Sequence, residues 1–118
     1  MVTLHISPTI TKATQLITST GASLAGARQM LPKAISLLVD LGEITPSLAN
    51  IIKQEALSIG ADAAVHEKTT RCKITKTKVI LIGNLAQLTQ LAEKLQKNIG
   101  KLPKIGQELA SQLLTVEN

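Results

Sequence analysis

The residues best suited to chemistry lie together in the middle of the chain. They comprise two amides, a lysine, two carboxylates and one of the two histidines: Asn50, Lys53, Gln54, Glu55, Asp62 and His66. A carboxylate close to a histidine can transfer protons, because an unperturbed imidazole titrates near neutral pH. A small enzyme that uses Glu55, Asp62 and His66 in one cleft is therefore one hypothesis for this chain.

A structural role explains the same side chains more simply. Lys53 and Glu55 are two residues apart, so on a helix they face different directions and should not pair with each other. Glu55 borders an apolar stripe, where it can accept hydrogen bonds or position a basic group. Asp62 closely follows Gly60 and is of the residue type that bonds the backbone amides of a turn.

No pattern in the chain is typical of a metal site or of an activated nucleophile. His5, His66 and Cys72 belong to three separate segments and lack the spacing of metal ligands. A single cysteine also excludes an internal disulfide. We therefore expect no metal and no cofactor, and the pattern assigns no catalytic residue.

A helix, a tight turn and a strand must position this polar cluster. Thr45 can cap the first free amides of the helix, and Pro46 suits its first position. Apolar residues then recur at helical spacing as far as Ile59, and Gly60 suits a left-handed stop. The small residues that follow, 61–65, fit a closely packed strand.

The same stretch has a recognisable sequence pattern. It reads N-I-I-K-Q-E-A-L from Asn50 and continues after Gly60 as A-D-A-A-V. It resembles the N-terminal extension that precedes the catalytic barrel in a subset of bacterial dihydropteroate synthases, where N-I-L-K-Q-E-M-L is followed by G-G-D-A-A-V. The matching residues are Asn50, Ile51, Lys53, Gln54, Glu55, Leu57, Gly60, Asp62, Ala63, Ala64 and Val65. Ala56 and Ala61 depart from the pattern, and the resemblance weakens beyond Lys97.

The resemblance implies a role in folate biosynthesis. The (β/α)8 barrel of the synthase needs about 250 residues, so it cannot lie within these 118 residues. We therefore expect a non-catalytic accessory domain whose partner is a catalytic barrel or another protein, with homo-oligomerisation as a further option. Residues 53–55 and 62–66 are the expected contact surface. The chain would be a single domain, complete in itself or the N-terminal domain of a longer protein.

An uneven charge distribution supports a different hypothesis. Residues 68–104 carry nine basic side chains and a single acidic one, within a chain of net charge +5. Such a stretch could bind an anion or nucleic acid as a stand-alone module, and Arg71, Lys73, Lys76 and Lys78 are its candidate residues. A solvated lysine-rich surface is the simpler alternative. Nucleic acid is further disfavoured because the chain has no aromatic residue on which bases could stack.

Hydrophobic periodicity predicts an α/β sandwich of about four or five strands, with helices on one or both faces and an aliphatic core. Strands are expected at 2–6, 35–41, 62–67 and 78–83, the last covered on both faces, and an exposed edge strand or hairpin arm at 68–77. Helices are expected from the Ser7-Pro8 pair to Thr20, and at 46–59, 84–97 and 103–114. Residues 22–31 should form a loop with one or two helical turns, ended by Pro32. No export signal or membrane-spanning run is evident, which predicts a cytoplasmic protein.

Overall fold

The computed structural model describes residues 1–69 and 74–116, and within them it confirms the mixed α/β class. The elements in chain order are α1 (Ile10–Thr18), α2 (Leu24–Ala34), β1 (Ser36–Ile44), α3 (Pro46–Ser58), β2 (Asp62–Ala64), β3 (Thr77–Asn84), α4 (Leu85–Gln96) and α5 (Leu102–Leu113). Three strands are thus found in the described residues, where four or five were expected.

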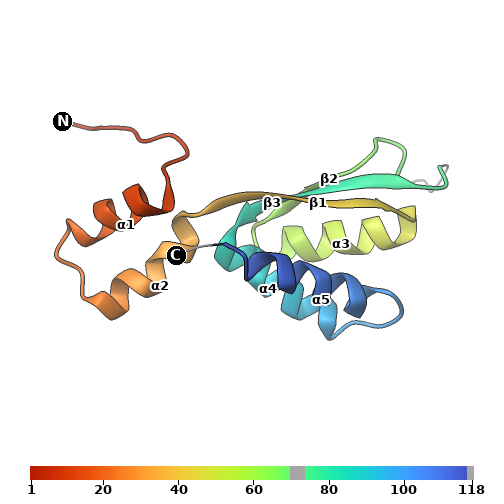
Figure 1. Cartoon of the computed structure of the whole chain (residues 1–118). Helices are drawn as coiled ribbons and strands as arrows, with labels where there is room; N and C mark the ends of the chain where they lie inside the picture. The colour runs from red at the N-terminus through yellow and green to blue at the C-terminus, as the bar shows by residue number, and fades with distance from the viewer. Residues whose placement is uncertain (70–73, 117–118) are drawn as a thin grey trace.

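The three strands form one antiparallel sheet in the order β1-β3-β2. The continuous apolar run of β3 is the central strand, as its sequence predicts. Helices α3, α4 and α5 lie along one side of the sheet, and the other side carries no helix (Figure 1). The expectation that β3 is covered on both faces is therefore wrong: Leu81 is fully buried, whereas Ile82 on the opposite face is 44% exposed.

The core between the sheet and these helices is aliphatic, as expected. Its buried members are alanine, isoleucine, valine and leucine side chains from α3, β2, β3, α4 and α5, together with Ala61. Without aromatic rings, dense packing depends on close backbone approach. At Gly106 of α5, an added Cβ would lie 2.8 Å from the carbonyl oxygen of Ala92 on α4, so only glycine permits this contact between the two helices.

The N-terminal third of the chain differs most from the prediction. Residues 2–6 form no strand; they run as an extended arm, in which the side chains of Val2, Leu4 and Ile6 are 98%, 81% and 82% exposed. Alternating apolar residues specify a strand only where a neighbouring strand can bond them. No strand of the described chain lies beside the arm, so the pattern is left unpaired.

Helices α1 and α2 correct two further expectations. The cap of α1 is Thr9, whose side chain accepts a hydrogen bond from the amide of Lys12, rather than the Ser7-Pro8 pair. The segment expected to be mainly loop is the eleven-residue helix α2, and Pro32 lies inside it. Ser23 caps the start of α2 through the amide of Gly26. Pro32 has no N–H to donate to the carbonyl one turn back, and α2 ends two residues later.

Several local signals are confirmed. Thr45 caps α3 with Pro46 at its start, Gly60 has a φ of +83°, and Asn84 and Gln87 form the expected capping box of α4. Strand β2 is shorter than predicted and ends at Ala64. The edge strand expected at 68–77 lies partly outside the described residues, and residues 74–76 adopt no strand.

Candidate functional site

Lysine 53 is the centre of the predicted polar cluster. Its Nζ lies 3.0 Å from Oδ1 of Asp62 and donates a second hydrogen bond, of 2.7 Å, to the carbonyl oxygen of Ala63. As the sequence spacing predicts, it does not pair with Glu55. The ion pair instead joins α3 to β2 across the turn at Gly60.

The two side chains of this ion pair also form hydrogen bonds with backbone groups of β2. The amide of Ala63 donates to Oδ1 of Asp62 at 2.7 Å, while the carbonyl of Ala63 accepts from Lys53. Ala63 is the middle residue of β2, an outer strand of the sheet. Both of its backbone polar groups are thus bonded by side chains of the same ion pair, so neither is left for an added strand.

These contacts lower the pKa of Asp62 below its ordinary value of 3.8. The main cause is the hydrogen bond from the Lys53 ammonium group, and the second is the hydrogen bond from the Ala63 amide. Both favour the ionised carboxylate. Asp62 is therefore charged at neutral pH and unsuited to act there as a general acid.

Glu55 belongs to a second ion pair, on the other side of α3. Its Oε2 lies 3.2 Å from Nζ of Lys94, which also donates to Oγ of Ser58 at 2.9 Å. The pair connects α3 to α4. The structural interpretation of Glu55, that it positions a basic group, is thus the one that its contacts fit.

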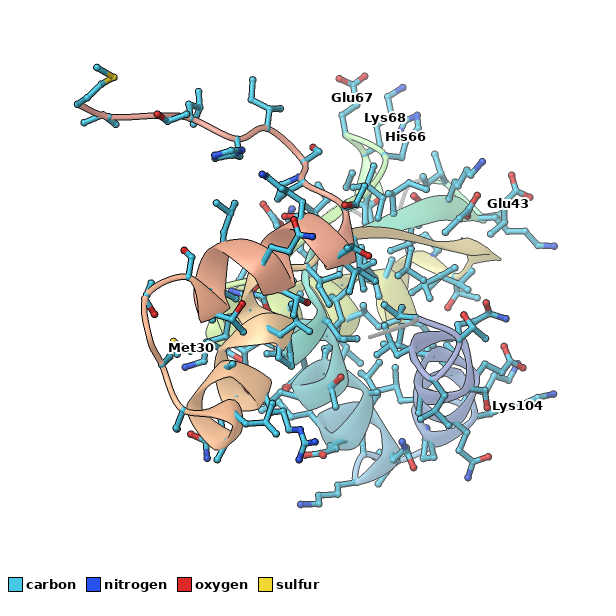
Figure 2. All side chains as sticks on the ribbon, turned by 60° about the vertical axis from the view of Figure 1, so that its left-hand side comes forward. Met30, Glu43, His66, Glu67, Lys68 and Lys104 are labelled. Carbon is cyan, nitrogen blue, oxygen red and sulfur yellow. The ribbon has the colours of Figure 1, made fainter. Side chains whose placement is uncertain are left out.

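His66 lies apart from both ion pairs. Its Nδ1 accepts a hydrogen bond from the amide of Lys68, and its own amide donates to Oγ1 of Thr77. The side chains of His66, Glu67 and Lys68 project from one loop (Figure 2). Among the described residues, no hydrogen bond joins the side chains of Glu55, Asp62 and His66, so the geometry does not assemble the cleft that an enzyme would need.

The two amides of the cluster are also placed by the structure. Nδ2 of Asn50 donates to the carbonyl of Thr69 at 3.1 Å and so holds the loop after β2 against α3. Gln54 is exposed. Thr69 itself is fully buried, although no sequence signal distinguishes it from the neighbouring threonines.

The basic residues do not form a single described face. Arg71 and Lys73 lie outside the described residues. Lys76 is exposed. Nζ of Lys78 lies 3.1 Å from Oδ2 of Asp40 on β1. Lys68 and Lys104, at the two ends of the basic stretch, lie on well-separated parts of the molecule (Figure 2).

The outer face of the sheet is the surface that the sequence analysis missed. Leu38 of β1 is 73% exposed and lies directly opposite Ile82 of β3. Asp62 of β2 is the partner of Ile82 on the other side, so the predicted contact residue Asp62 borders this apolar pair. The signal was the alternation within residues 36–41, which places every second side chain of a strand on the face away from the helices.

Two other kinds of site are lacking in what the structure describes. Residues 1–69 and 74–116 contain no group of three or more histidine, cysteine, aspartate or glutamate side chains that could hold a metal ion. None of the helices in these ranges is both long enough and apolar enough to cross a bilayer.

No protein-family model, curated protein or solved structure matches this chain. Its function therefore has to be argued from its own residues and from the sequence pattern around α3.

Proposed function

We propose that this chain is a non-catalytic accessory domain of a dihydropteroate synthase-like protein, and that it docks onto the catalytic barrel through the outer face of its sheet. The observation that carries the proposal is the uncovered apolar pair of Leu38 and Ile82 at the middle of that face. The resemblance of residues 50–65 to the synthase extension supplies the partner. The domain would then work in the cytoplasm with the enzyme it serves.

The polar cluster supports a structural rather than a chemical use of its charges. Lys53 and Asp62 bond each other and β2, and Glu55 bonds Lys94 of α4. A catalytic acid or base needs its proton-transferring atoms free to meet a substrate. These side chains instead hold α3 to β2 and to α4, and so stiffen the layer of helices beneath the sheet.

The composition of the outer face is suited to a protein partner. Leu38, Ile80 and Ile82 provide apolar surface, and the ion pairs Asp40–Lys78 and Asp62–Lys53 flank it. Interfaces commonly combine an apolar centre with a polar rim. The predicted contact region 62–66 overlaps this surface, because Asp62 and Ala64 of β2 pair with Ile82 and Ile80.

Titration of the purified chain against the purified catalytic barrel of the synthase from the same source tests the proposal. Isothermal calorimetry should detect a complex with the unmodified chain. The double variant Leu38→Asp/Ile82→Asp should weaken it at least about a hundredfold, because two charges would be buried without partners. The isolated chain should show no synthase activity.

The control is Leu57→Asp, which places one aspartate on α3 at a residue that is 52% exposed. This variant should bind the barrel as the unmodified chain does. Absence of binding by the unmodified chain, or equal binding by the double variant, would contradict the proposal.

A further inference from the structure

The outer edge of β1 is a vacant position for another strand. Strand β1 spans nine residues and, within the part of the chain that the structure describes, pairs only with β3, as the first strand in the order β1-β3-β2. Beside it lies a groove of about 700 Å³ between β1 and α5. Its walls include Val39 and Leu41 from β1 and Ile105 and Leu109 from α5, so an incoming strand would find both backbone partners and an apolar floor.

The opposite edge of the sheet, along β2, is closed to an added strand. Lys53 and Asp62 bond the amide and the carbonyl of Ala63 in β2. Outer strands of monomeric proteins are commonly protected by such charged side chains. In the described part of the chain, the corresponding bond in β1 is confined to its bulge, where Oδ1 of Asp40 accepts from the amide of Gly42 and Oδ2 pairs with Lys78.

The N-terminal arm, residues 1–9, has the sequence of a strand but lies beside none. Val2, Leu4 and Ile6 alternate with Thr3 and His5. The three apolar side chains are at least 81% exposed. The arm lies on the α1 side of the molecule and runs away from the sheet of its own chain in both views (Figures 1 and 2), so the apolar surface it carries is available to another molecule.

We propose that residues 2–6 of one copy add to the outer edge of β1 in a second copy, as a fourth antiparallel strand, and that the exchange is reciprocal. Exchange of identical elements is a low-cost route to a two-fold dimer. It converts the three-stranded sheet of each copy into a four-stranded one, within the range of four or five strands that the sequence pattern predicts. This inference does not rest on the proposed function, because it uses the edge of the sheet and not its outer face.

The alternation of the two segments fixes which side chains meet. In β1, Leu37, Val39 and Leu41 turn towards the helices, and Leu38 and Asp40 turn away. An antiparallel arm with Leu4 opposite Leu41 and Ile6 opposite Val39 places these two apolar side chains over the groove, while Val2 lies beyond the bulge between Asp40 and Glu43. The intervening His5 then lies opposite Asp40.

Charge favours the same arrangement. Asp40 and Glu108 both line the groove, and the arm contains no acidic side chain that would repel them. Opposite charges on directly paired residues stabilise a sheet, and like charges destabilise it.

The area required also argues for two-way exchange with a second copy. A stable interface buries about 800 Å² on each partner, and five residues laid in one groove cover less than that. In a reciprocal dimer each copy buries its own arm and also has its groove covered, so each arm contributes to both surfaces.

Light scattering of the size-fractionated chain tests the proposal. We expect a species of twice the 12.5 kDa of one chain, which dissociates on dilution. Leu4→Asn should weaken the dimer at least about tenfold, because each of two grooves loses a buried leucine. Thr3→Asn introduces the same side chain one residue away, on the face turned from the groove, and should leave the dimer unchanged.

Complementation separates arm exchange from any other dimer. A chain lacking residues 1–7 keeps the groove but has no arm, and Ser111→Trp fills the groove from the exposed side of α5 while keeping the arm. Each chain alone should be monomeric, and an equimolar mixture should form a heterodimer, weaker than the unmodified dimer because it has one arm in one groove.

Three results would overturn the inference. The first is an unmodified chain that stays monomeric at all concentrations. If the arm amides of that monomer were protected from hydrogen exchange, the arm would lie on β1 of its own chain. The second is a dimer that survives removal of residues 1–7. The third is a mixture of the two complementary chains that remains monomeric.

Discussion

The two outer strands of the sheet, β1 and β2, differ in what lies along their free edges. Beside β2, a lysine and an aspartate bond the backbone of Ala63. Beside β1 there is a groove lined by aliphatic side chains of the strand and of α5. The longer strand is thus the one whose edge remains available. Because the β2 edge is closed and the β1 edge is open, a further strand can be added to the sheet only beside β1.

The largest expected effect is a loss of stability when a side chain in the wall of the β1 groove is truncated. Leu109 of α5 is 1% exposed and belongs to both the groove and the core. Leu109→Ala should lower the free energy of unfolding by about 2–5 kcal/mol, through lost apolar burial and the cavity it leaves. Urea denaturation followed by circular dichroism measures this.

Leu114→Ala is the matched control for that substitution. Leu114 follows α5 directly and is 87% exposed, so its truncation should change the free energy of unfolding by no more than about 0.5 kcal/mol. Equal losses in the two variants would show that α5 is not packed against the sheet as described.

A smaller effect is expected from opening the β2 edge. The double variant Lys53→Met/Asp62→Asn removes the ammonium group that bonds the carbonyl of Ala63 and leaves a weaker acceptor for its amide. The carbonyl of this outer strand is then able to bond other molecules. We expect earlier aggregation on heating, measured by light scattering against temperature.

The control variant also removes one lysine charge and one aspartate charge, but from the outer face of the sheet and not from the β2 edge. Lys78→Met/Asp40→Asn breaks the ion pair between β3 and β1 and leaves β2 closed. It should aggregate later than the β2 variant; the reverse order would contradict the role assigned to Lys53 and Asp62.

The smallest effect is the pH dependence of the closed edge. The pKa of Asp62 is lowered in the folded chain, so the ionised carboxylate stabilises the fold above the ordinary pKa of 3.8. This contribution is lost as the pH falls through the lowered value. The difference in unfolding midpoint between the unmodified chain and Asp62→Asn should therefore shrink on acidification.

Lys53→Met provides the internal check on that pH dependence. The Lys53 ammonium group is the largest cause of the lowered pKa of Asp62. Its removal should therefore make the acid-linked loss of stability smaller. An unchanged pH profile in this variant would assign the effect to another carboxylate.

Local signals in the sequence predicted much of this structure, because the interactions behind them are local. The cap at Thr45, the left-handed Gly60 and the capping box of Asn84 each involve residues within one turn of each other. Strand β3 is recognisable from sequence because the four consecutive residues 79–82 are all large and apolar. Helix α2 departs from its prediction because Gly26 and Pro32 both disfavour a helix, whereas the cap at Ser23 favours one.

The features that sequence could not supply depend on which strands become neighbours. Nothing in Val2–Ile6 indicates whether a partner strand will be present, and nothing in β1 indicates that its edge stays vacant. The cluster residues were found, but their partners were not: the bond of Lys53 to Ala63 and that of Glu55 to Lys94 require the α3–β2 turn and the packing of α3 on α4.

Under the proposed function, this chain serves a catalytic barrel and does no chemistry itself. The most direct test is the mass of the native species in its source cells, detected with an antibody raised against the chain. The account predicts a species of roughly 40 kDa or more that contains a synthase barrel of about 250 residues, on the same polypeptide or in a complex. A species of 12.5 kDa, or a dimer of it, that is free of any synthase would contradict the account.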